Sequence, residues 1–322
     1  MGLFKRYKNP HIKCIKRTPF HFLAWMLGFY KDRDKKTVPK DFTYPLIKGD
    51  KGCAKAIFVN HCTYVLEIFN LVFLTDPIWS ERCSPFSFFG PKRSHKPHIQ
   101  IKDLKKLDYV LISHNHYDHL DLYSVREIYN HFPKVTFIVP VGLKRWFERR
   151  GIENVVELDW WQSVFFQTAK HSPEIEIVAT PAQHHSGRGP FDSNTSLWAG
   201  YMVTVKDKGE CKRFYFAGDT AYNPYDFKNI GARYKDVDLS ICPIGTYLPK
   251  KFMETVHLSP EHAVAIHKDI NPKLSLGMHW GTFKLSEEPH NAPPYDLYQE
   301  MKKQNLDPSL FLPILPGDSV NW

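Results

Sequence analysis

The stretch Ser113-His114-Asn115-His116-Tyr117-Asp118-His119 contains four side chains of the kinds that bind metal ions. It follows an apolar run typical of a strand and precedes a helical pattern, and α/β proteins place their chemistry in loops of this kind. His114 and His116 are two residues apart in an extended segment, so they point to one side. Asp118 and His119 come where the chain turns and can face a second ion. A polar loop that caps the following helix is the structural alternative.

One short run cannot complete two ion sites, but three later apolar runs also end at a ligand-type residue. Residues 175–180 lead to the pair His184-His185, residues 214–218 lead to Asp219, and residues 274–278 lead to His279. A single histidine after a strand is more often structural, yet together these residues would complete a set of seven ligands. Spacing alone does not decide between His184 and His185.

Short apolar runs alternate with helical patterns from residue 51 onward, and this alternation predicts a layered α/β domain. The Ser259-Pro260 pair gives a clear helix start, with serine as N-cap and proline in the first turn. We expect strands at 56–58, 64–68, 72–75, 109–113, 136–140, 155–158, 175–180, 197–205, 213–217, 239–243 and 274–278, and helices at 122–132, 142–150, 260–270 and 294–304.

The composition is that of a globular protein with an ample core, because 43% of the 322 residues are hydrophobic and 24% are charged. The six cysteines are scattered without a CxxC pair, so neither a disulfide framework nor a structural zinc module is indicated. A reducing, cytoplasmic compartment fits this usage. The apolar run 20–30 is too short to span a bilayer and is followed by charged residues, so we expect neither a signal peptide nor a transmembrane helix.

The basic character of the chain belongs to its N-terminal segment. Residues 1–40 hold eleven Lys/Arg and two acidic residues, which accounts for the whole net charge of +9. We therefore predict a basic extension with a short apolar helix at residues 1–50, and a catalytic domain at residues 51–322. Such an extension suits an anionic membrane surface, with peripheral association of the protein. A solvated arm, or packing of the apolar run against the domain, is the alternative.

The order of ligands, HxHxDH followed by His, Gly-Asp and a final His, resembles the metallo-β-lactamase superfamily. The resemblance implies an αββα four-layer sandwich with a two-metal centre. It assigns one ion to His114, His116 and His184, and the other to Asp118, His119 and His279, with Asp219 bridging. The superfamily pattern aligns Thr180-Pro181-x-x-His184, which favours His184 over His185.

Motifs around the ligands narrow the resemblance to the N-acylphosphatidylethanolamine-hydrolysing phospholipase D group and its bacterial relatives. The chain departs from that group at Asn60, before His61, where the group has glycine, and at His185, where it commonly has tryptophan. The motifs that carry the resemblance are Leu74–Ser80, Gly90–Arg93, Leu158–Trp161, Phe216–Thr220, Pro243–Tyr247 and His279–Phe283.

The resemblance implies a two-metal hydrolase that cleaves N-acylphosphatidylethanolamine to N-acylethanolamine and phosphatidic acid. Two divalent ions suit a phosphodiester, and zinc is the default for such ligands, although iron or manganese would use the same residues. Asp76 is expected to orient a ligand histidine, and His257 to protonate the leaving group or contact the phosphate. The predicted catalytic residues are Asp118, Asp219, His257 and Asp76.

Two alternatives change the function. The same centre could act on a lactone, a soluble phosphodiester or a nucleic acid. Nucleic acid is the weakest of these, because the body of the chain is neutral and offers no long basic track. A non-enzymatic scaffold that binds through the basic arm is the other alternative. The expected partners are a phospholipid substrate and an anionic membrane, with no nucleic acid; the oligomeric state stays open, a homodimer included.

Overall fold

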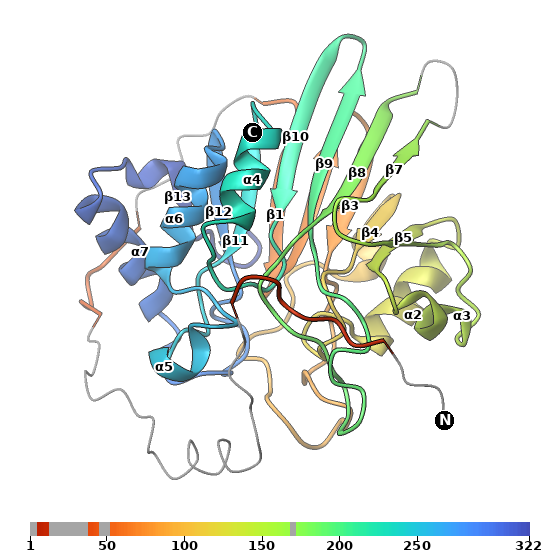
Figure 1. Ribbon diagram of the computed structural model, residues 1–322, viewed down its shortest axis with the longest axis horizontal. Coiled ribbons are helices and arrows are strands. Elements are labelled where there is room, and N and C mark those ends of the chain that lie inside the picture. Colours follow the sequence, from red (N-terminus) through yellow and green to blue (C-terminus); the bar gives the residue numbers. More distant parts are fainter. Residues whose placement is uncertain (1–4, 13–37, 45–51, 168–171) are drawn as a thin grey trace.

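The computed structural model describes residues 5–12, 38–44, 52–167 and 172–322. Within these ranges the strands form two seven-stranded sheets, with the orders β14-β1-β2-β3-β4-β5-β6 and β13-β12-β11-β10-β9-β8-β7. Helices cover the outer face of each sheet (Figure 1). The predicted αββα four-layer sandwich is therefore confirmed.

The strands of the first sheet are β1 (Lys55–Asn60), β2 (Thr63–Ile68), β3 (Leu71–Thr75), β4 (Tyr109–Leu111), β5 (Thr136–Pro140), β6 (Val155–Leu158) and β14 (Ser319–Asn321). Those of the second are β7 (Ser163–Phe166), β8 (Glu174–Thr180), β9 (Gly200–Asp207), β10 (Glu210–Phe216), β11 (Leu239–Pro243), β12 (Leu274–Met278) and β13 (Phe311–Leu312). The α-helices are α2 (Leu122–His131), α3 (Lys144–Glu148), α4 (Asp226–Arg233), α5 (Lys250–Met253), α6 (Pro260–Ile270) and α7 (Ala292–Lys303). Two single 3-10 turns, Ile101–Asp103 and Pro308–Leu310, complete the set.

The alternation of side chains along the strands creates the layers. In β4, Tyr109 and Leu111 join the core between the sheets, while Val110 packs on the other face with Val125 and Ile128 of α2. Both faces of this strand are apolar because both are covered.

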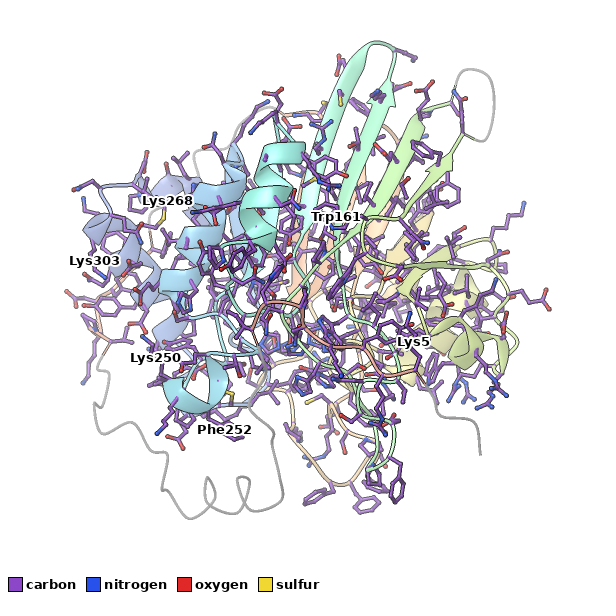
Figure 2. The ribbon with its side chains drawn as sticks, viewed as in Figure 1. Lys5, Trp161, Lys250, Phe252, Lys268 and Lys303 are labelled. Carbon is purple, nitrogen blue, oxygen red and sulfur yellow. The ribbon has the colours of Figure 1, made fainter. Side chains whose placement is uncertain are left out.

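On the far side of the second sheet, α6 packs between α4 and α7. Lys268 of α6 and Lys303 of α7 are exposed on the outer side of these helices (Figure 2).

Helix α6 begins and ends where the sequence predicts. The Ser259 side chain accepts a hydrogen bond from the backbone of His262, and Pro260 occupies the first turn, where no N–H partner is needed. The helix ends at Asn271, which adopts a left-handed conformation with φ of 53°. This start places the loop that carries His257 at the same end of the sandwich as the ligand loops.

Most predicted strands are confirmed, but several bounds were wrong and some elements were not predicted. The strand expected at 197–205 begins only at Gly200, because residues 197–199 cross between the sheets, where Ala199 donates a backbone hydrogen bond to Ser113. Helices α4 and α5 and the edge strands β7, β13 and β14 were not predicted. The apolar helix expected near residues 20–30 lies outside the described residues. Among the described helices, none combines the length and apolar character needed to cross a membrane.

Two described pieces of the N-terminal segment contact the body of the protein. Residues 5–12 run along the loop that follows β8, where Tyr7 donates a backbone hydrogen bond to Asn194. In Figure 1 this piece is the red trace that crosses near the lower ends of the strands. Further along, Phe42 packs its ring against Tyr295 and Tyr298 of α7. Both pieces therefore lie against the domain.

Candidate metal centre

The loops that follow β4, β8, β10 and β12 meet at one end of the sandwich, and they bring the seven predicted ligands together. Hydrogen bonds between the sheets hold this end closed. Tyr64 of β2 donates to the carbonyl of Gly277, and Tyr201 of β9 donates to the carbonyl of Ile112. The ligands therefore stand on the ends of strands that are fixed relative to one another.

The first group consists of His114, His116 and His184, whose ligand atoms lie within 4.8 Å of one another. His116 presents Nδ1, which is 2.7 Å from Nε2 of His114 and 3.3 Å from Nε2 of His184. Three imidazole nitrogens that converge in this way form one face of a tetrahedral metal site. These are the three residues that the superfamily pattern assigns to one ion.

The second group consists of Asp118, His119, Asp219 and His279. The Asp219 Oδ2 atom is 3.2 Å from Nε2 of His119 and 3.1 Å from Nε2 of His279. The same oxygen is 3.8 Å from Nε2 of His184, in the first group. Asp219 thus stands between the two groups, which is the position that a bridging carboxylate needs.

Hydrogen bonds behind the ligand histidines fix which ring nitrogen faces the centre. His119 Nδ1 lies 2.7 Å from Oδ2 of Asp76, and His184 Nδ1 lies 2.7 Å from the carbonyl oxygen of Val256. His279 Nδ1 lies 3.0 Å from the hydroxyl of Thr246. With Nδ1 occupied in this way, the Nε2 lone pair of each ring is directed at the centre.

Asp76 is completely buried, and its carboxylate accepts hydrogen bonds from Ser113 as well as facing His119. The Ser113 backbone N–H donates to Oδ1 at 2.7 Å, and the Ser113 hydroxyl donates to Oδ2 at 2.5 Å. Burial raises the pKa of Asp76, while His119 and Ser113 lower it in part. Asp76 thus lies directly behind His119, one of the candidate ligands.

The electrostatics of the cluster suit a cation. Burial raises the pKa of Asp118 and Asp219, but the neighbouring histidines, with His119 contributing most, together outweigh burial and hold both pKa values well below the usual range. Burial and neighbouring histidines hold the pKa of His114 and His184 well below the ordinary value. The carboxylates are therefore ionised and these imidazoles neutral, which is the protonation state of metal ligands.

His119 and His279 behave differently without an ion. Burial lowers the pKa of each ring, but the carboxylates of Asp219 and Asp118 together outweigh burial and raise the pKa, to well above the usual range for His119 and to about 9 for His279. These two rings thus carry protons that a bound cation would displace.

Buried polar atoms without hydrogen-bond partners test whether the residues fit a metal. Among the described residues, such atoms include Nε2 of His119, Nε2 of His279 and Oδ1 of Asp219. Unpaired buried polar atoms are rare and costly, and these three belong to one cluster. A set of imidazole nitrogens and carboxylate oxygens suits zinc, iron or manganese. The residues therefore fit a metal centre.

Three further histidines surround this centre. Nδ1 of His257 lies 3.7 Å from Oδ2 of Asp219, and His257 is 9% exposed, so it stands at the rim of the candidate centre. His61 lies 3.0 Å through Nε2 from Oδ2 of Asp118. The ring of His185 lies 4.7 Å from that of His184, but the candidate groups among the described residues include His184 and not His185.

The backbone is unusual at the centre. His61, Asp76 and His279 have φ of 46°, 30° and 61°, which non-glycine residues rarely adopt. Gly218, just before Asp219, has φ of 61°, and a Cβ there would lie 2.6 Å from the Cβ of Ser113. Such strain clusters at functional sites, where the surrounding structure maintains it.

Sequence reasoning missed several residues that support the ligands. Arg188 donates from Nη1 to the carbonyls of Asn115 and Leu120, and its guanidinium lies 3.8 Å from the ring of Tyr117. It thus ties the loop after β8 to the loop after β4. Thr246 lies in a motif quoted above, Pro243–Tyr247, and that motif was the only signal for it.

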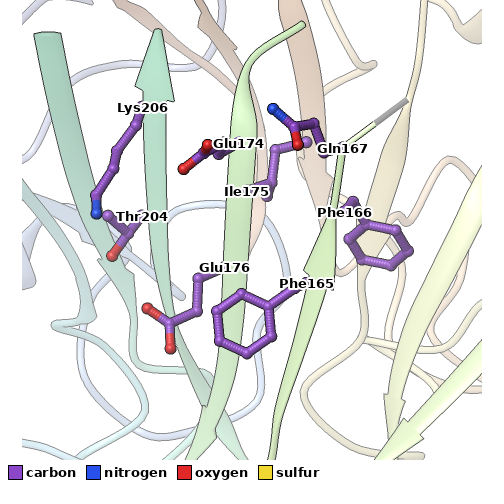
Figure 3. Close-up of a pocket in the computed structure, with 8 residues that line it drawn as sticks. All are labelled: Phe165, Phe166, Gln167, Glu174, Ile175, Glu176, Thr204 and Lys206. Atoms are coloured by element: carbon purple, nitrogen blue, oxygen red, sulfur yellow. The ribbon is translucent and has the colours of Figure 1, made fainter. Parts of the chain in front are cut away.

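A hollow of about 380 Å³ lies away from this centre, between β7, β8 and β9 (Figure 3). Its lining includes Phe165, Glu176 and Lys206. It adjoins the beginning of β8, whereas the candidate ligand His184 follows the end of that strand. The hollow therefore offers no access to the candidate metal centre.

Comparison with protein families gives one domain match, to the beta-lactamase superfamily domain over residues 72–280. N-acyl-phosphatidylethanolamine-hydrolyzing phospholipase D 1 of Caenorhabditis elegans is 38% identical over 270 residues, which cover 82% of this chain and 74% of the relative. An uncharacterized protein of Mycobacterium tuberculosis is 34% identical over 326 residues, 99% of this chain and 83% of that protein.

Solved structures share the fold at low identity. An isothiocyanate hydrolase from Delia radicum gut bacteria has a TM-score of 0.64 at 16% identity, and the match covers 83% of this chain and 99% of that one. Igni18, a metallo hydrolase from Ignicoccus hospitalis, has a TM-score of 0.58 at 19% identity, with 83% and 97% covered. At these identities the likeness concerns the fold alone.

Proposed function

The chain belongs to the beta-lactamase superfamily and is a metal-dependent hydrolase with the metallo-β-lactamase fold; from this premise we propose that it is a phospholipase D-type enzyme. Its substrate would be N-acylphosphatidylethanolamine, and its products N-acylethanolamine and phosphatidic acid. The observation that supports metal-dependent chemistry is the convergence of the seven candidate ligand residues. The relative from Caenorhabditis elegans, matched over 82% of this chain, supports the substrate.

Two zinc ions are the proposed cofactors, one held by His114, His116 and His184 and the other by Asp118, His119 and His279, with Asp219 shared. Ions in such a pair activate water and neutralise negative charge on the phosphoryl and leaving oxygens.

The chain's own residues orient this chemistry. Asp76 holds His119 in the tautomer that turns Nε2 inward, because the carboxylate accepts the proton on Nδ1. Nε2 of His61 lies 3.0 Å from Oδ2 of Asp118 and limits the rotation of that carboxylate. His257 stands at the rim, where it can reach a bound substrate and donate a proton to the leaving oxygen or bind the phosphate.

The function is tested with vesicles that contain N-acylphosphatidylethanolamine, and both products are measured by mass spectrometry. We expect equal amounts of N-acylethanolamine and phosphatidic acid, and a loss of at least 100-fold in the His116→Ala variant, because a metal ligand is removed. His131→Ala, at an exposed position on α2, is the matched control and should retain full activity. A parallel panel of lactones, soluble phosphodiesters and nucleic acid covers the alternatives. Turnover of one of these with none of the lipid would overturn the proposed substrate.

Exposed aromatic side chains on two loops near the centre support a lipid substrate. Phe88 and Phe89 are 80% and 70% exposed, and Phe191 is 86% exposed. The first loop is tied to the strand ends by Arg93, which donates to the carbonyl of Ile78. The loops are the orange and green ones that extend below the strands in Figure 1. Large apolar side chains that face water at such positions are typical of surfaces that enter a lipid interface.

Vesicle sedimentation tests this contact. We expect the double variant Phe88→Ser, Phe89→Ser to bind vesicles at least 10-fold more weakly, because the loss of each ring removes apolar area that the membrane interface would bury. Phe165→Ser is the matched control, since Phe165 is 70% exposed but lies on β7, away from the centre. Equal losses in both variants would contradict a specific docking face.

The basic N-terminal segment is the second proposed membrane contact. Residues 13–36 contain seven Lys/Arg, and replacing all seven with glutamine leaves residues 5–12, which contact the domain, unchanged. We expect weaker binding to vesicles rich in anionic lipid and little change for neutral vesicles, because cationic residues near such a surface each contribute about 1 kcal/mol. Unchanged binding to anionic vesicles would exclude this contact.

A further inference from the structure

Residues 5–12 lie along the loop that carries the metal ligand His184. Arg6 donates from Nη2 to the carbonyl of Phe191 at 3.1 Å, and Tyr7 donates from its backbone to Asn194 at 2.9 Å. The side chain of Gln183 donates to the carbonyl of Ile12 at 2.8 Å. These contacts run from one end of the segment to the other. The segment is therefore continuous with the wall of the site.

Asn9 makes the most direct contact, because its side-chain amide pairs with both backbone groups of His184. Its Nδ2 donates to the carbonyl oxygen of His184 at 2.8 Å, and its Oδ1 accepts from the N–H of His184 at 3.2 Å. This pairing copies the two hydrogen bonds that a neighbouring strand would make. The pairing fixes the peptide of one candidate metal ligand through a residue that is distant in the sequence.

The ring and the peptide of His184 are thus held by different parts of the chain. The ring is oriented by the carbonyl of Val256, which faces Nδ1 at 2.7 Å. The preceding residue, Gln183, is held by Thr220 and Ala221, directly after the shared ligand Asp219. Because both the ring and the backbone of His184 are held by hydrogen bonds, the position of its Nε2 atom relative to His116 is restricted.

We propose that Asn9 is a positioning residue for His184, and that residues 5–12 therefore complete the site formed by His114, His116 and His184. The inference rests on the proposed metal centre. The ion on Asp118, His119 and His279 does not depend on Asn9, because those residues are fixed by Asp76, Thr246 and the ends of β4 and β12.

Zinc titration of the full-length apoprotein against a chelating indicator tests the proposal, since it resolves the two ions separately. Two variants separate hydrogen bonding from packing. Asn9→Ala removes both bonds. Asn9→Asp keeps the shape, but it sets a carboxylate oxygen against the carbonyl of His184. We expect both variants to bind one ion roughly 10–100-fold more weakly and the other ion with wild-type affinity, as for other residues behind metal ligands.

Controls keep the result interpretable. Asn130→Ala, at an exposed position on α2, should bind both ions as the wild type does. The apoprotein melting temperature should hardly change in any variant, because Asn9 is only half-buried. Wild-type affinity for both ions in Asn9→Asp would overturn the proposal, and so would equal weakening of both ions with a lowered apoprotein melting temperature. A wild-type protein that binds no zinc would instead overturn the metal centre itself, and this inference with it.

Discussion

Replacing Asp76 with asparagine changes one buried atom and should weaken one metal ion. The carboxylate of Asp76 faces Nδ1 of His119 at 2.7 Å and accepts two hydrogen bonds from Ser113. An asparagine can keep its oxygen on the backbone N–H of Ser113, but then its NH₂ group faces His119. To accept that hydrogen bond, His119 must carry its proton on Nε2, which is the atom that should bind the ion.

The size of the effect follows from the contact that is lost. A hydrogen bond to a charged group contributes about 1.5–3 kcal/mol, and each 1.4 kcal/mol corresponds to about a factor of ten in affinity. We therefore expect the ion on Asp118, His119 and His279 to bind roughly 10–100-fold more weakly in Asp76→Asn. The other ion should bind nearly as before.

The assay is a zinc competition titration of wild type, Asp76→Asn and the control Asp236→Asn, at an exposed site. Hydrolysis of the proposed lipid substrate should fall in parallel with occupancy of the weakened site and recover in part at higher zinc concentration. If Asp76→Asn binds both ions as tightly as the wild type, the reasoning that Asp76 sets the tautomer of His119 is refuted.

Three other perturbations have expected outcomes. Gly218→Ala should destabilise the fold by about 2–4 kcal/mol in urea unfolding, because the new Cβ would clash with Ser113 at a position with a left-handed backbone. The control Gly209→Ala, with φ of 88° but open space around it, should cost only about 1 kcal/mol. Equal losses of stability in the two variants would contradict the steric argument. Burial lowers the pKa of His267 to about 4, so between pH 6.5 and 4 the unfolded chain binds a proton that the folded chain does not, and stability falls as the pH falls through this window. His267→Gln should therefore lose about 2 kcal/mol less than wild type between pH 7 and pH 5, and identical pH profiles would exclude this role. Removing metal with a chelator should lower the melting temperature, since each ion adds about 2.7 kcal/mol at a free concentration 100-fold above its dissociation constant; an unchanged melting temperature would argue against bound ions.

The sequence was sufficient where structure is decided locally. The start of α6 follows from Ser259 and Pro260, and the buried strands follow from apolar runs between turn residues. Helix α4 was not predicted because Gly231 and several polar residues weaken its pattern. The structure gives the reason for that glycine, since a Cβ there would lie 1.9 Å from the carbonyl oxygen of Asp269 in α6. Close packing of two helices thus overrides local propensity.

In the candidate site, too, some residues have a local sequence signal and others do not. Each candidate ligand follows a strand, so its sequence context marks it. The choice of His184 came from a superfamily pattern, and in the structure His184 lies with His114 and His116. The contact of His61 with Asp118 and that of Asn9 with His184 join residues far apart in the chain. Such pairs have no local signal, because they exist only once the sheets have packed and residues 5–12 lie along the loop after β8.

The number of zinc ions per chain tests the central claim most directly. Metal analysis of the purified full-length protein should give two ions for the wild type and one for His116→Ala, which removes a ligand of only one group. One ion or none in the wild type, or two ions in the variant, would contradict a two-metal centre held by these seven residues.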